Sequence, residues 1–143
     1  MKFGNVYFIN GTAYAGKSTL VKLLLRFYDV SKGAIYIKGR DIRTIPSEEF
    51  CAMFGTAMQY DFLYADTVYE NIRFGRDISR EQIEQAAKVA QAHDFITFFK
   101  DGYEHMLSSK ATNISGGQKQ RLLIARAIAG NPDILILDDS SSA

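Results

Sequence analysis

The sequence predicts an α/β fold with a mainly parallel sheet. Short apolar runs alternate with stretches of helical periodicity along the chain. The first run, residues 6–9, is followed by a glycine-containing loop and a helical pattern. The last run, residues 134–137, follows another helical pattern and ends at two aspartates. Because parallel strands need a crossover connection between them, this alternation favours a parallel sheet.

The first half of the chain is expected to contain two helices and three strands. The first helix follows a loop at residues 11–18 and reaches about residue 28, because four apolar side chains share one helical face: Leu20, Leu23, Leu24 and Phe27. The other expected elements, in chain order, are a strand at 6–9, a turn at 31–33, a strand at 34–38, a connection at 39–46, a short helix at 47–52 and a strand running towards Gln59.

The second half is expected to be mainly helical. Residues 60–76 are rich in aromatic side chains and are predicted to be irregular. A capping box at residues 79–82 predicts a helix whose buried stripe is formed by alanines and one isoleucine: Ile83, Ala86, Ala87 and Ala90. Another helix is predicted at residues 116–129, stopped by Gly130 and Pro132. A central strand at 134–137 follows it.

Composition excludes several classes of protein. The chain has 143 residues, 47% of them hydrophobic and 23% charged, which suits one globular domain with a real core. A net charge of +1 gives no basic surface for nucleic acid. No apolar run is long enough for a membrane span. The single cysteine, Cys51, is expected to be a buried core thiol, and the two histidines have no spacing typical of zinc sites.

Residues 11–18 match the phosphate-loop pattern G-x-x-x-x-G-K-[ST] between an expected strand and an expected helix. The backbone amides of such a loop surround the β-phosphate of a nucleotide, the lysine reaches the β- and γ-phosphates, and the hydroxyl that follows binds Mg²⁺. The candidate nucleotide-binding residues are therefore Gly11, Thr12, Ala13, Tyr14, Ala15, Gly16, Lys17, Ser18 and Thr19. Lys17 is a candidate catalytic residue and Ser18 a candidate Mg²⁺ ligand.

A second candidate anion site begins at Ser115 in the run Asn-Ile-Ser-Gly-Gly-Gln-Lys-Gln-Arg, residues 113–121. Ser115 is suited to cap a helix, since its hydroxyl accepts a bond from a free backbone N–H. Gly116 and Gly117 carry no side chain, so an anion can approach their amides closely. The helix adds the positive end of its dipole, and Gln118 donates without adding charge. These four residues are the second group of candidate nucleotide contacts.

The run at 113–121 closely resembles the signature loop of ABC-type ATPases. This resemblance implies a P-loop NTPase fold in which the signature contacts the γ-phosphate of an ATP molecule held by a second copy of the domain. It also implies a core at residues 1–59 and 116–143, with a helical insert at about 60–115. The partners expected from it are a second ABC ATP-binding domain and the transmembrane domain of a transporter, and the expected location is the cytoplasmic face of the cell membrane.

The resemblance assigns further residues. Asp138 ends an apolar strand, as in the Walker B element, and is expected to hold Mg²⁺. Gln59 matches the Q-loop glutamine, which senses both Mg²⁺ and the attacking water. Asp139 stands at the general-base position, where the family normally has glutamate. This favours a degenerate site with slow hydrolysis over a working base. Tyr14 replaces the family's usual glycine, and a positive φ there costs on the order of 1–2 kcal/mol.

The leading hypothesis is the ATPase domain of an exporter, because residues 62–72 resemble the exporter version of that region. The resemblance is convincing from about residue 22 onwards. Two features of the family are missing from this sequence: the strands before the phosphate loop and the switch histidine. The acidic stretch that the family has before the signature is replaced by other residues at 108–112. We therefore expect a fragment of a longer domain. Three alternatives remain: a small-molecule P-loop kinase, supported by the first 21 residues, a non-transport ABC ATPase, and a non-catalytic interaction fragment.

Overall fold

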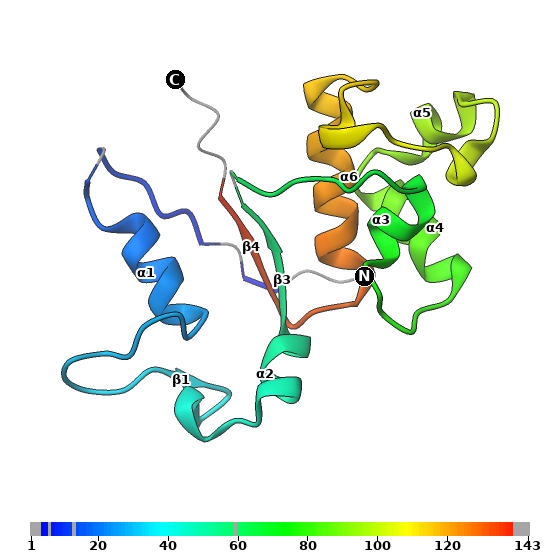
Figure 1. Ribbon diagram of the computed structural model, residues 1–143. Helices are drawn as coiled ribbons and strands as arrows, with labels where there is room; N and C mark the ends of the chain where they lie inside the picture. The colour runs from blue at the N-terminus through cyan, green and yellow to red at the C-terminus, as the bar shows by residue number, and fades with distance from the viewer. Residues whose placement is uncertain (1–3, 6, 13, 59, 139–143) are drawn as a thin grey trace. The chain divides into compact units, whose positions relative to one another are not determined.

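The computed structural model describes residues 4–5, 7–12, 14–58 and 60–138, and Figure 1 traces the chain. The chain divides into two compact units, Met1–Cys51 and Ala52–Ala143. Each unit has its own two-stranded sheet and its own buried side chains. Among the described residues, the expected mainly parallel sheet is therefore represented by one parallel pair of strands and one antiparallel pair.

The first unit contains helix α1 (Lys17–Leu24) and a hairpin of β1 (Tyr36–Ile37) and β2 (Arg40–Asp41). A 3₁₀ turn, η1 (Ile42–Thr44), follows, and α2 (Ser47–Met53) begins in this unit. Asp41 caps η1 by accepting a hydrogen bond from the Arg43 amide. The buried side chains of this unit are Ile37, Ile42, Ile45 and Phe50.

Helix α1 ends four residues earlier than its apolar periodicity predicts. Arg26 has a left-handed φ of 58° and donates its amide to the Leu23 carbonyl, at 3.2 Å. The Phe27 amide donates to the Lys22 carbonyl, at 2.8 Å. This pair of bonds is a Schellman motif, which normally has glycine at the left-handed position. Because arginine stands there instead, the sequence gives no stop signal, and the expectation of a helix to residue 28 is wrong.

Three further expectations for the first unit need correction. A strand is predicted at residues 6–9, but its described residues do not form one. Tyr7, Phe8 and Ile9 are 80%, 93% and 55% exposed. These residues belong to neither strand pair, and a strand is stabilised only by pairing. The connection predicted at 39–46 contains β2 and η1. Cys51 is exposed, because the buried positions of α2 are Phe50 and Met53, one turn apart.

The second unit is built around helix α6 (Gly116–Ala129). Strands β3 (Phe54–Ala57) and β4 (Ile134–Leu137) pair in parallel, with Phe54 opposite Ile134 and Ala57 opposite Leu137. Figure 1 shows α6 between this pair and the helices α3 (Val68–Arg73) and α4 (Arg80–Val89). A Cβ atom at Gly55 would lie 2.0 Å from the Ala127 carbonyl oxygen, so glycine is required where β3 meets α6.

The remaining elements of the second unit are short: α5 (His93–Phe98), η2 (Gly102–Glu104) and η3 (Ser109–Ala111). The core between the helices holds the predicted stripe of α4 together with one face of α6. Its fully or almost fully buried side chains include Leu63, Val68, Ile72, Ile83, Ala87, Ile96, Leu107, Leu122, Ala125 and Ile128. Burial of such apolar surface is the main stabilising contribution in a unit of this size.

The two predicted helix starts in this unit are confirmed. Ser79 and Ser115 each accept a bond from the amide three residues later, and Gln82 and Gln118 each return a side-chain bond. Helix α6 ends at Ala129, as predicted, although the left-handed residue after it is Asn131.

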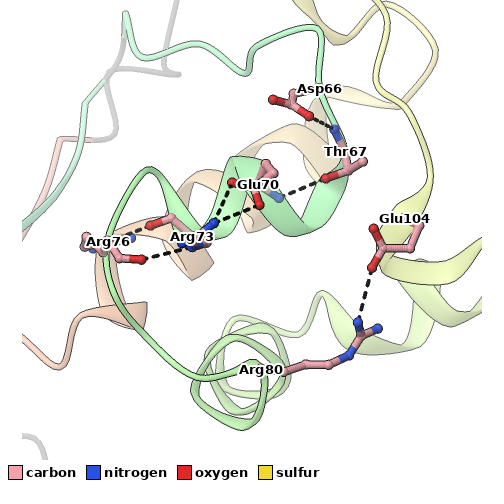
Figure 2. A network of polar contacts seen from close by, with 7 residues as sticks. All are labelled: Asp66, Thr67, Glu70, Arg73, Arg76, Arg80 and Glu104. Carbon is pink, nitrogen blue, oxygen red and sulfur yellow. Dashed lines mark hydrogen bonds and ion pairs between the residues drawn. The ribbon is translucent and has the colours of Figure 1, made fainter.

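Helix α3 lies within the stretch predicted to be irregular, so that expectation is wrong for residues 68–73. Thr67 caps it by accepting from the Glu70 amide at 3.0 Å, and Asp66 accepts from the Thr67 amide at 2.7 Å (Figure 2). Glu70 also pairs with Arg73, at 3.1 Å. A threonine followed three residues later by glutamate is a helix-start signal, and its aromatic neighbours concealed it.

Candidate nucleotide-binding site

The phosphate loop reverses direction through two left-handed residues. Tyr14 has a φ of 67° and Gly16 a φ of 88°. The Ala15 amide donates to the Thr12 carbonyl at 3.2 Å, which closes the turn between them. Ala13 lies outside the described residues. The φ of Tyr14 is therefore positive, which is the backbone conformation that strains a tyrosine at this position.

Lys17 lies across this loop. Its Nζ donates to the carbonyl oxygens of Gly11, at 2.6 Å, and Thr12, at 2.9 Å. Lys17 is also the first residue of α1, whose N-cap is Gly16 and has no capping side chain. The first turn of α1 contains no acidic residue. An ammonium group and the positive end of a helix dipole thus meet at one loop, which is the arrangement that binds phosphate.

Ser18 and Thr19 lie in the first turn of α1, and both are exposed. Their hydroxyl groups directly follow Lys17 in the sequence, next to the loop. A hydroxyl oxygen is a hard ligand of the kind that Mg²⁺ accepts. The residues present in the first unit therefore fit a nucleotide phosphate group with its metal ion.

The second predicted anion site is the N-terminus of α6. Ser115 Oγ accepts from the Gln118 amide at 3.2 Å, and Gln118 Oε1 accepts from the Ser115 amide at 2.9 Å. The amides of Gly116 and Gly117 donate to no acceptor in the described part of the chain. Both glycines are exposed, and a Cβ atom added at either one would meet nothing within 4 Å. The glutamine thus caps the helix, and two amides remain directed to solvent.

Asp138 follows β4 and is half-buried. Its amide donates to the Ala57 carbonyl at 2.9 Å, which extends the parallel ladder by one bond beyond the end of β4. The carboxyl ends of β3 and β4 therefore lie at the same edge of this sheet, where ligands bind in open α/β folds. The two other residues predicted at this edge, Gln59 and Asp139, lie outside the described residues.

A largely buried polar cluster that the sequence did not predict lies beside the aromatic segment, residues 62–74. Its members are Arg126, Asn71 and Arg76, and we call it the Arg126 cluster. The Arg126 guanidinium donates to Asn71 O at 2.8 Å, Asn71 Oδ1 at 2.9 Å and Phe62 O at 2.8 Å. Arg76 Nη2 donates to the Arg126 carbonyl at 2.6 Å and the Ile72 carbonyl at 2.8 Å. Burial lowers the pKa of both arginines.

Asn71 is 1% exposed, and its side chain uses every donor and acceptor. Its Nδ2 donates to the carbonyls of Tyr64, at 3.0 Å, and Thr67, at 2.9 Å, while Oδ1 accepts from the Tyr64 amide, at 2.8 Å. The Arg126 guanidinium also lies 4.4 Å from the ring centre of Phe74 and 5.7 Å from that of Tyr64. The cluster therefore joins the segment from Phe62 to Asn71 to helix α6.

The chain is similar to known proteins along almost its whole length. The model of the ABC transporter family matches residues 1–142. The chain belongs to the ABC transporter family. It is 43% identical to ABC transporter B family member 4 of Dictyostelium discoideum, over all of this chain and 19% of that protein. It is 44% identical to the mitochondrial potassium channel ATP-binding subunit of Rattus norvegicus, over 98% of this chain and 20% of that protein.

A solved structure shows the same relationship. A bacterial Atm1-family ABC exporter with ATP bound superposes with a TM-score of 0.82 and 41% identity, over 92% of this chain and 24% of that one. The chain thus spans a quarter or less of the length of these ABC proteins. It has the P-loop NTPase fold of a nucleotide-binding ABC domain.

The family match favours an ABC domain over a small-molecule kinase. A small-molecule kinase was supported by the first 21 residues alone, and the ABC transporter model matches those residues as well.

Within the described residues of this ABC domain, no helix has the length and apolar character needed to cross a membrane.

Proposed function

We propose that the chain is the ATP-binding part of an ABC exporter and powers transport by ATP-driven association and hydrolysis. One observation carries this proposal: the Lys17 ammonium lies on the carbonyls of the phosphate loop, at the uncapped N-terminus of α1. A triphosphate that enters the loop can replace these carbonyl contacts by stronger charge-assisted bonds to Lys17.

Each candidate residue has a proposed role. The amides of residues 11–16 hold the β-phosphate, Lys17 contacts the β- and γ-phosphates, and Thr19 lies near the α-phosphate. Ser18, Gln59 and Asp138 are the residues that would hold Mg²⁺. Bound there, the ion would neutralise charge on the phosphate oxygens. Asp139 stands at the proposed general-base position, where a side chain one methylene shorter than glutamate would hold the carboxylate about 1 Å or more too far from the water.

The proposed partner at the γ-phosphate is a second ABC ATP-binding domain. Ser115, Gly116, Gly117 and Gln118 of that domain would close on the nucleotide, because the two solvent-directed glycine amides of α6 suit an anion. In this proposal, residues 1–59 and 116–143 form the P-loop core, and about 60–115 form the helical insert. Replacing Ser115 by arginine should block the ATP-dependent association by bulk and charge.

The aromatic segment is the proposed contact with a transmembrane domain at the cytoplasmic face of the membrane. Phe62, Tyr64 and Phe74 are each about half exposed, at 53%, 47% and 48%. The ring centres of Phe62 and Tyr64 lie 4.9 Å apart, and those of Tyr64 and Phe74 lie 5.9 Å apart. Aromatic side chains gathered at a surface are typical of protein interfaces.

Calorimetric titration with Mg·ATP tests the proposed binding. The 143-residue chain should bind weakly, and Lys17→Ala should abolish the heat of binding. Lys22→Ala is the matched control, since Lys22 lies on the same helix but its Nζ is 6.0 Å from the Tyr28 ring centre instead of in the loop. Equal ATP affinity in the parent chain and Lys17→Ala, with both folded by circular dichroism, would overturn the proposal.

A further inference from the structure

Tyr14 combines a strained backbone with an unused side chain. Its φ of 67° lies in the left-handed region, which costs a non-glycine residue on the order of 1–2 kcal/mol. Its side chain is 105% exposed. It makes no hydrogen bond or ring contact with the part of the chain that the structure describes. Packing against the described residues therefore does not explain why a tyrosine occupies this position.

The neighbours of Tyr14 in the loop are small. Gly11, Thr12, Ala15 and Gly16 carry at most a threonine side chain, and the Lys17 ammonium is held against the loop carbonyls. Among the described residues of the loop, Tyr14 is thus the only large side chain that extends into solvent. Any surface that covers the loop must either displace this ring or pack against it.

The surface proposed to cover the loop has little to pack with. Ser115, Gly116 and Gly117 are exposed and present at most a hydroxymethyl group. The amides of a helix end bind a phosphate oxygen only at hydrogen-bond distance, about 2.7–3.2 Å. In the proposed sandwich, an exposed tyrosine ring on the phosphate loop would keep the approaching helix end from that distance unless the ring moved aside. A side chain confined in this way would lose rotamer freedom.

We propose that Tyr14 is a steric restraint on closure of the nucleotide sandwich, so that two nucleotide-loaded domains associate less tightly than they would with a small residue at this position. This inference rests on the proposed function, because it requires a second domain that closes over bound ATP. It gives the strained tyrosine a role in setting the affinity between domains, by the principle that a built-in clash disfavours one state relative to another.

Four substitutions separate bulk from backbone strain. Tyr14→Gly removes both, and Tyr14→Asn removes the bulk and tolerates a positive φ. Tyr14→Ala removes the bulk and keeps the strain, whereas Tyr14→Phe keeps both. If bulk sets the affinity, the glycine, asparagine and alanine variants should associate alike. If strain sets it, alanine should behave like the parent chain.

The experiment is sedimentation equilibrium of the 143-residue chain at saturating Mg·ATP, with calorimetry of ATP binding on the same samples. We expect Tyr14→Gly, Tyr14→Asn and Tyr14→Ala to strengthen association about tenfold, at the lower end of the range for relief of overpacking. Tyr14→Phe should associate as weakly as the parent chain. Tyr36→Ala, which removes another exposed tyrosine of the same unit, should leave association unchanged.

The failures of the two proposals are distinguishable. Loss of ATP binding in the parent chain would overturn the proposed function. Unchanged or weaker association of Tyr14→Ala, with ATP still bound, would overturn the restraint alone. A weaker dimer in particular would mean that the ring packs favourably against the partner. Stronger association of Tyr14→Gly without stronger association of Tyr14→Ala would assign the effect to backbone strain and would also overturn the proposal.

Discussion

The phosphate loop and the Arg126 cluster use positive charge in opposite ways. The Lys17 ammonium lies in an exposed loop, bonded to two carbonyls that a ligand can replace. Arg126 is 9% exposed, and its guanidinium is bonded to three acceptors of its own chain. A cation held by replaceable partners is available for binding, whereas a cation whose partners are buried acts on the fold. The comparison separates residues that serve a ligand from residues that position others.

Removing the Arg126 guanidinium should give the largest change in stability. Arg126→Ala leaves Asn71 Oδ1 and the carbonyls of Asn71 and Phe62 without this donor, and we expect a loss of about 3 kcal/mol or more in the free energy of unfolding. Arg80→Ala is the control, because its bonds to Glu84 and Glu104, each 3.2 Å, lie at the surface and should contribute less than about 1 kcal/mol.

Urea denaturation followed by circular dichroism measures both losses. Arg126→Lys sharpens the comparison, since lysine keeps the charge but cannot direct three donors as the planar guanidinium does. It should fall between the parent chain and Arg126→Ala. Equal stability of Arg126→Ala and Arg80→Ala would mean that the cluster does not support the fold.

Two glycines should respond in opposite directions to the same substitution. Gly55→Ala places a Cβ atom 2.0 Å from the Ala127 carbonyl oxygen and 2.8 Å from Pro132 Cγ, so overpacking should cost about 1–3 kcal/mol. Gly117→Ala meets open space in the first turn of α6 and should be neutral, or stabilising by up to about 1 kcal/mol. Thermal denaturation of the two variants checks the sign. A stable Gly55→Ala would contradict the close approach of β3 and α6.

The two capping boxes provide a test of function at equal structural cost. Ser79→Ala and Ser115→Ala each remove an N-cap hydroxyl and should each cost about 1 kcal/mol of stability. Only Ser115→Ala should also weaken ATP-dependent association, because Ser115 stands at the proposed contact with the γ-phosphate. Sedimentation with and without Mg·ATP measures this. If both variants weaken association equally, a loss of helix stability explains the effect, and the role of Ser115 is wrong.

The phosphate loop and the start of α6 could be predicted because their local sequences determine their conformation. Glycines, a lysine and a capping serine at fixed spacing specify a turn and a helix end whatever the rest of the chain does. The same reasoning succeeded for α4, where Ser79 and Gln82 form the expected bonds. The family assigned from these residues is confirmed by the match over residues 1–142.

The Arg126 cluster could not be predicted because most of its acceptors are backbone carbonyls. Arg126 bonds to residues 55 and 64 positions away in the sequence, and no side-chain pattern marks a carbonyl that needs a donor. Its position in α6 gave a partial signal, since an arginine between Ala125 and Ala127 stands within an apolar stretch. The left-handed residue Arg26 was concealed for a related reason, because it is not the glycine that normally marks such a backbone.

The smallest expected effect concerns the alkaline stability of the second unit. Tyr103 is 5% exposed, and its hydroxyl lies 2.9 Å from His93 Nδ1. Burial, and secondarily the charge of Glu84, raises the pKa of Tyr103 from 10.0 to about 12. The folded chain therefore holds this proton at a pH where the unfolded chain has released it. The contribution to stability is complete below about pH 10 and is lost as the pH rises towards 12.

Urea midpoints at pH 9 and pH 11 test this dependence. The parent chain should lose stability between the two values, and Tyr103→Phe should lose less, because phenylalanine has no proton to release. Tyr103→Phe should also start about 1 kcal/mol lower at pH 9, since the bond to His93 is absent. Tyr36→Phe, at an exposed tyrosine, should follow the parent chain at both values. If Tyr103→Phe and the parent chain lose equal stability, titration of other groups causes the alkaline loss, and the buried phenol does not contribute.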